Sequence, residues 1–129
     1  MSLSFNNPAI RLVPPKFDRV ELVEPLEVTH PLGKMVIHPG FVCDLESVPK
    51  VVQFLPGMDK LGKGAIPGII HDYLYSTGLL SKPMADAVYL EAMKQRRVGT
   101  LARWIKYLAV RLCGGKAWRA HRRRHHKPA

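Results

Sequence analysis

The sequence predicts an α+β fold: a small N-terminal antiparallel β-sheet followed by a helical hairpin and a third amphipathic helix. Short apolar runs that alternate with polar residues fill the chain up to residue 37 and are separated by Pro- and Gly-containing turns. Helix start and stop signals then bound two segments within residues 67 to 93. Beyond residue 100, large apolar residues recur at helical spacing. Strands that precede helices in this way are typical of the α+β class.

Proline limits the length of the expected strands. The candidate strands cover residues 9–13, 18–30 and 35–37. Pro25 interrupts the second of these runs, because proline cannot donate to a sheet ladder, and this predicts two short strands or one bent edge strand. Residues 31–34 read as the turn before the last strand.

The hairpin is defined by residues that favour helix ends. Pro67 fits a first-turn position, where its missing N–H has no helical partner. Gly78 supplies a C-terminal stop, since glycine adopts left-handed backbone angles without penalty. Ser81 is expected to cap the second helix, with Pro83 in its first turn.

A third helix is expected to begin with Thr100 as its cap. Its apolar stripe consists of Leu101, Trp104, Ile105, Leu108 and Leu112. We expect this face to pack on the hairpin. A basic amphipathic helix can also lie on a membrane, and that alternative stays open.

Composition indicates a globular chain with an uneven charge. The 129 residues are 47% hydrophobic and 23% charged, which predicts one α+β domain over residues 1–118 and a basic tail over 119–129. Residues 1–91 hold eight Lys/Arg and ten Asp/Glu, whereas residues 92–129 hold twelve Lys/Arg and no acid. This cationic third suits phosphates, an acidic protein face or anionic lipid, or is a solvated tail without a partner.

Neither a secretion signal nor a transmembrane segment is expected, because the start lacks a charged region followed by an apolar one and no apolar run is long enough. Cys43 and Cys113 have no metal-binding spacing, so both are expected to be thiols.

A polar cluster within the apolar hairpin is the main candidate site. His71 and Tyr75 lie one helical turn apart and share a face, and Asp72 is rotated about 100° from His71. Asp86 follows near the start of the second helix. Such a cluster suits a proton-accepting imidazole beside a cation-binding carboxylate. The competing interpretation is a hydrogen-bonded histidine that only stabilises the core.

Two further segments supply candidate ligands. Asp44 lies among apolar neighbours, and its partner is a backbone N–H of its own loop, a metal or His71. Residues 54–64 are Gly-rich and lead into the first helix of the hairpin. Carbonyl oxygens of this loop, together with Asp72, would suit Ca²⁺, with Zn²⁺ less favoured; a connector without a ligand is the alternative.

The order of these motifs resembles a phage and prophage family catalogued as domain of unknown function 1353, over roughly residues 18 to 119. The residues that carry the resemblance are Gly40-Phe-Val-Cys-Asp44-x-x-Ser47-Val-Pro49, Ile69-Ile-His71-Asp72-Tyr-Leu-Tyr75, Ala85-Asp86 and Trp118. The resemblance implies a phage-encoded protein of the tail or another late gene, with other phage structural proteins as partners. It implies a location in the virion or the host cytoplasm, and no settled activity.

The His71-Asp72-x-x-Tyr75 motif followed by Ala85-Asp86 is also similar to the active helices of phospholipase A2 enzymes, including the capsid-linked viral type. That similarity implies that His71 activates water, Asp72 binds calcium and Asp86 orients His71 while bonding Tyr75. The disulfides of the secreted enzymes are absent, and an N-terminal sheet precedes the site.

Helix arithmetic places Asp86 nearer to Tyr75 than to His71 across an antiparallel pair, so Asp44 is the other candidate for orienting His71.

Three functions are consistent with the sequence. The first is a phage particle component whose His/Asp cluster serves hydrolysis. Its alternative form is an enzyme proper, a calcium-dependent phospholipase-like or other cell-envelope hydrolase. The second is a structural or adaptor protein in which the same cluster fixes the fold. The third is nucleic-acid or anionic-membrane binding through residues 94–127.

Overall fold

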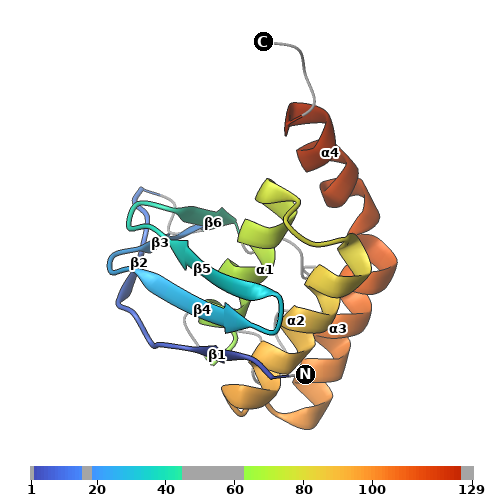
Figure 1. The fold of residues 1–129 in the computed structure, drawn as a ribbon, viewed down its shortest axis with the longest axis horizontal. Coiled ribbons are helices and arrows are strands. Elements are labelled where there is room, and N and C mark those ends of the chain that lie inside the picture. The colour runs from blue at the N-terminus through green and yellow to red at the C-terminus, as the bar shows by residue number, and fades with distance from the viewer. Residues whose placement is uncertain (1, 16–18, 45–62, 126–129) are drawn as a thin grey trace. The chain divides into compact units, whose positions relative to one another are not determined.

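The computed structural model describes residues 2–15, 19–44 and 63–125 (Figure 1). The chain forms two compact units, Met1–Leu45 and Glu46–Ala129. Strands make up the described part of the first unit and helices that of the second, which confirms the α+β class. The single domain over residues 1–118 stays a prediction.

The expected strands and helices appear in the predicted order. The strands are β1 (Ser4–Phe5), β2 (Ile10–Leu12), β3 (Arg19–Leu22), β4 (Leu26–His30), β5 (Gly33–Ile37) and β6 (Val42–Asp44). The helices are α1 (Ala65–Thr77), α2 (Lys82–Gln95), α3 (Thr100–Cys113) and α4 (Gly115–His125). Among these elements, β1, β6 and α4 are additional ones that the sequence did not predict.

The strands form two antiparallel sheets, in the orders β1-β4-β5 and β2-β3-β6, where the sequence predicted one. The chain passes from the second sheet to the first between β3 and β4, at Pro25. Asn6 holds this passage, because its side-chain amide donates to the Pro25 carbonyl (3.0 Å) and its oxygen accepts from the Glu27 N–H (2.7 Å). Proline therefore divides the alternating run into strands of different sheets.

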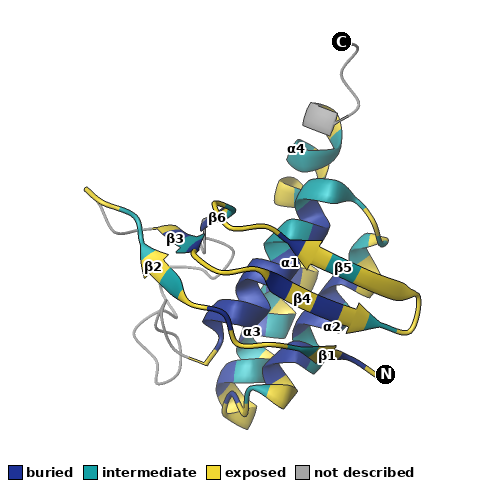
Figure 2. Ribbon diagram, turned by 60° about the vertical axis from the view of Figure 1, so that its left-hand side comes forward, coloured by how far each residue is buried: buried dark blue, intermediate teal, exposed yellow. Residues whose placement is uncertain are grey.

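The burial pattern follows the two-residue period of a strand. Leu26 and Val28 of β4 are buried while Glu27 and Thr29 are exposed. The β4 ribbon in Figure 2 accordingly alternates between the buried and exposed colours. In β6, Cys43 is buried and Val42 is exposed. The β4–β5 hairpin pairs each strand residue from Leu26↔Ile37 to His30↔Gly33.

In the second unit, α1 packs against α2 and α4, and α2 packs against α3. The predicted helix ends of the hairpin are confirmed. Gly78 closes α1 with a left-handed φ of 66°, and its N–H donates to the Leu74 carbonyl (2.9 Å). Ser81 caps α2, since its side-chain oxygen accepts from the Met84 N–H.

The face on which α3 packs differs from the predicted one. Its N-cap is Gly99 rather than Thr100, and its buried residues are Ala102, Lys106 and Val110. Ala102 and Val110 are small or branched, and they pack with Tyr89, Met93 and Val98 in one apolar cluster. Lys106 has a long, flexible side chain. Of the predicted stripe, Leu101, Trp104, Leu108 and Leu112 are exposed. The fifth residue, Ile105, is partly buried against the apolar cluster. The prediction that the stripe packs on the hairpin was therefore wrong for four of its five residues, because side-chain size does not determine which face fits a neighbouring helix.

The basic segment after Trp118 continues as helix α4 to His125. Trp118 anchors it, because its ring contacts the Tyr75 ring of α1 edge-on, with 5.2 Å between centroids. Arg122 lies over the Trp118 ring at 5.0 Å and donates from Nη2 to the carbonyls of Tyr75 (2.8 Å) and Ser76 (3.0 Å). A cation therefore satisfies carbonyls at the C-terminal end of α1.

Both cysteines are free thiols, Cys43 buried in β6 and Cys113 exposed at the end of α3.

Within the described residues, no helix combines the length and the apolar character that crossing a bilayer requires.

Replacing Arg122 by Ala should destabilise the protein by about 1–2 kcal/mol, because two carbonyls lose a charged donor and Trp118 loses its covering side chain. Urea unfolding at neutral pH measures the change. Arg123→Ala is the matched control, since Arg123 is exposed on the same helix and should have little effect. Equal stability of the two variants would contradict a capping role for Arg122.

Candidate functional site

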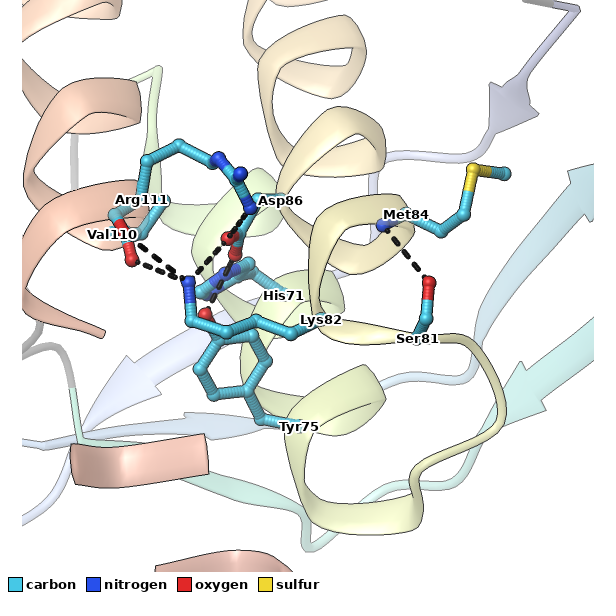
Figure 3. A network of polar contacts seen from close by, with 8 residues as sticks. All are labelled: His71, Tyr75, Ser81, Lys82, Met84, Asp86, Val110 and Arg111. Atoms are coloured by element: carbon cyan, nitrogen blue, oxygen red, sulfur yellow. Dashed lines mark hydrogen bonds and ion pairs between the residues drawn. The ribbon is translucent and has the colours of Figure 1, made fainter. Parts of the chain in front are cut away.

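The candidate site is centred on Asp86 of α2, whose side chain is 0% exposed. Its Oδ1 lies 2.7 Å from Nε2 of His71 and accepts a hydrogen bond of 2.7 Å from the Tyr75 hydroxyl (Figure 3). His71 and Tyr75 both belong to α1, four residues apart, so their side chains project from one face of that helix. One carboxylate oxygen of α2 therefore holds two side chains of α1.

The second oxygen of Asp86 is held by cations. Oδ2 accepts from Nζ of Lys82 at 2.8 Å and lies 3.4 Å from Nη1 of Arg111 on α3. Lys82 Nζ also donates to the Val110 carbonyl at 3.0 Å, in the last turn of α3, where a positive charge is favoured. Figure 3 shows the ammonium of Lys82 between the Asp86 carboxylate and α3. The network thus joins α1, α2 and α3.

Asp86 is ionised despite its burial. Burial alone would raise the pKa of the carboxyl, but hydrogen bonds from His71, Lys82 and Tyr75 stabilise the charged form and lower the pKa to about 2. The same carboxylate and burial raise the pKa of Tyr75, so its hydroxyl keeps its proton and acts as a donor.

His71 is neutral at pH 7, because burial lowers the pKa of the imidazole below 6.5 more than the neighbouring carboxylate raises it. Its ring lies between those of Tyr75 and Tyr89, with centroid distances of 4.2 and 4.7 Å. An ionised Asp86 accepts only, so the hydrogen bond requires the imidazole proton on Nε2. Nδ1 is then the nitrogen with the lone pair, and hence the basic atom of the ring.

The structure brings together three of the residues that the sequence selected: His71, Tyr75 and Asp86. The expectation that Asp86 reaches Tyr75 more easily than His71 was wrong, since one oxygen reaches both at the same distance. Asp44 ends β6, where its backbone pairs with Arg19, and it belongs to the first compact unit. His71 bonds Asp86, and a contact between Asp44 and His71 stays a prediction.

The Asp72 carboxylate lies near helix α4. Its Oδ1 lies 3.9 Å from Nε2 of His121 on α4, and both side chains are partly exposed. In residues 2–15, 19–44 and 63–125, no group of three His, Cys, Asp or Glu side chains is placed to hold a metal ion. In the Gly-rich loop 54–64, whose carbonyls were expected to bind calcium, Gly57 and Gly62 lie outside the described residues, and Gly64 is the N-cap of α1. Calcium binding by Asp72 stays a prediction.

Two members of the network, Lys82 and Arg111, did not emerge from the sequence. Lys82 could have been found, because it precedes Asp86 by four residues on one helix, a spacing that favours ion pairs. Arg111 lies on another helix, and no local pattern connects it to Asp86.

A family model described as "Protein of unknown function (DUF1353)" matches residues 20–110, more than half of the chain, so the chain belongs to this family. No curated protein and no solved structure gives a significant match.

The protein should lose stability on acidification in two steps. Because the pKa of His71 is lower in the folded than in the unfolded chain, the unfolded chain binds more protons once the pH falls below about 6.5. Asp86 adds a second loss as the pH falls from about 4 toward 2, since its folded pKa is about 2.

Urea unfolding between pH 7 and pH 5 measures the first step. The wild type should be less stable at pH 5, and His71→Gln should be less sensitive to pH over this range. The exposed His38→Gln is the control and should keep the wild-type dependence. A pH dependence that is unchanged in His71→Gln would contradict a lowered pKa of His71.

Proposed function

We propose that the protein is a phage-encoded particle component, from the tail or another late gene, in which His71 and Asp86 form a hydrolytic pair. The observation that carries the hydrolytic part is the shared Asp86 oxygen, 2.7 Å from His71 Nε2 and from the Tyr75 hydroxyl. It is the arrangement that the similarity to phospholipase A2 enzymes implies. The phage origin is supported by the resemblance of the motif order to a phage and prophage family.

The chemistry follows from the tautomer of His71. With its proton on Nε2 beside ionised Asp86, the neutral imidazole accepts a proton from water at Nδ1 while the water oxygen attacks an ester carbonyl. Asp86 stabilises the imidazolium that forms. The ester C–O bond then breaks, and the proton passes from Nδ1 to the departing alkoxide. Hydrogen bonds from His71, Lys82 and Tyr75 keep the carboxylate ionised.

We infer that the substrate is an ester of a phospholipid, or another ester or amide of the cell envelope. This substrate class comes from the phospholipase A2 similarity and suits a particle that must cross an envelope. Calcium bound by Asp72 belongs to the same proposal and would polarise the substrate carbonyl.

Replacing His71 by Gln or Asp86 by Asn should reduce hydrolysis of phospholipid vesicles by about 10²- to 10⁴-fold, the usual contribution of a general base. Released fatty acid is the readout, with His38→Gln as the control, and circular dichroism checks that each variant folds. Calorimetric titration of Ca²⁺ and Zn²⁺ into wild type and Asp72→Asn tests the metal. A wild type without turnover on vesicles and on envelope preparations would refute the hydrolytic role.

A second candidate is a purely structural role in the particle. The observation that favours it is that, among the described residues, Asp86 has four donors that come from three different helices, so its carboxylate already holds the fold together. Basic helices α3 and α4 would then dock on acidic neighbouring proteins.

The structural role is tested by purifying phage particles and searching for the chain by mass spectrometry. It should co-purify in a fixed copy number, and His71→Ala should lower the free energy of unfolding by roughly 1–3 kcal/mol without affecting a reaction. Absence from purified particles would exclude a particle component of either kind.

A further inference from the structure

The outward face of α3 is apolar. Leu101 is 72% exposed, Leu108 50% and Leu112 80%, and Trp104 between them is 42% exposed. Their spacing of three or four residues places them on one side of the helix, opposite the buried Ala102 and Val110. Trp104 also meets the Tyr107 ring edge-on, with 5.7 Å between centroids. We call the four exposed residues the α3 apolar face.

Exposed cations flank this face at both ends of the helix. Lys94 and Arg97 precede α3, while Lys116, Arg119 and Arg123 follow it on α4. The sequence from residue 92 onward contains no Asp or Glu to offset them. A partner of this surface must therefore accept leucines and a tryptophan between two positively charged regions.

We propose that the α3 apolar face binds the surface of an anionic phospholipid bilayer. Leu101, Leu108 and Leu112 would enter the boundary between headgroups and acyl chains, and the flanking Lys and Arg side chains would contact anionic headgroups. Trp104 suits this depth, because its ring is apolar and its N–H remains able to donate to water or a headgroup.

Charge and hydrophobicity together favour a bilayer over a second copy of the chain or a nucleic acid. Pairing with a second copy of α3 would bring two cationic surfaces together, which is unfavourable. A nucleic acid would satisfy the cations but leave the leucines in water. An anionic bilayer satisfies both. The inference does not depend on the proposed hydrolysis, since binding requires no turnover.

Co-sedimentation with vesicles of phosphatidylcholine, with and without phosphatidylserine, tests the proposal. The wild type should pellet with the anionic vesicles, and the tryptophan fluorescence of a Trp118→Phe variant, which reports Trp104 alone, should shift to shorter wavelength. Replacing Leu108 and Leu112 together by Gln should weaken binding at least tenfold, because two buried apolar side chains are lost. Leu32→Gln is the control, since Leu32 is 76% exposed in the β4–β5 turn.

The electrostatic part has its own pair of variants. Replacing both Lys116 and Arg119 by Gln should weaken vesicle binding about thirtyfold at low salt. Each cation near an anionic surface contributes roughly a fivefold factor, and the two factors multiply. Lys34→Gln, which removes an exposed cation from β5, should change binding little. High salt should weaken the wild type in the same way.

Several outcomes would overturn the proposal. They are no pelleting with anionic vesicles, equal pelleting of the leucine variant, a dimer that the leucine substitutions dissociate without any vesicle binding, or binding of duplex DNA in place of vesicles. Circular dichroism checks that the variant with both Leu108→Gln and Leu112→Gln folds. If that variant does not fold, the single variant Leu112→Gln is tested in its place. Binding without hydrolysis would refute the proposed hydrolytic role only, whereas hydrolysis without binding at this face would refute this inference only.

Discussion

The helical unit depends on the ionised carboxylate of Asp86, which has no exposure to water. A buried charge is tolerated only when its lone pairs are satisfied, and here the donors come from α1, α2 and α3. Loss of one donor leaves a charge without full compensation, so the three helices are stabilised as a set. The same contacts fix the proton of His71 on Nε2. The contacts of Asp86 therefore support both the stability of the fold and the proposed chemistry, so substitution of a residue in this network is expected to change both.

Local signals in the sequence predicted most of the elements. Alternation and Pro25 located the strands, and Gly78 and Ser81 located the ends of the hairpin helices, because caps and prolines act through the nearest backbone groups. The pairing of strands into two sheets and the orientation of α3 were not predicted. Both depend on which surfaces fit one another, and the α3 cluster selected Ala102 and Val110 over larger residues.

The candidate site was predictable to a similar extent. Spacing on one helix placed His71 beside Tyr75, and the similarity to phospholipase A2 enzymes implied Asp86 as their common partner, whereas helix arithmetic kept Asp44 as the alternative for His71. Arg111 was not predicted, because the packing of α3 on α2 brings it to Asp86 and no local sequence pattern indicates that packing. The basic segment after Trp118 was expected to be a tail, yet the guanidinium of Arg122 donates hydrogen bonds to two carbonyls of α1.

The two thiols differ in a way that makes α3 accessible to spectroscopy. Cys43 is buried within β6, whereas Cys113 is exposed directly after Leu112. A maleimide probe should modify the exposed sulfur of the folded chain far faster than the buried one, without removal of either cysteine. A polarity-sensitive dye attached there would report the surroundings of the last turn of α3, and a spin label would report how deeply that turn is immersed.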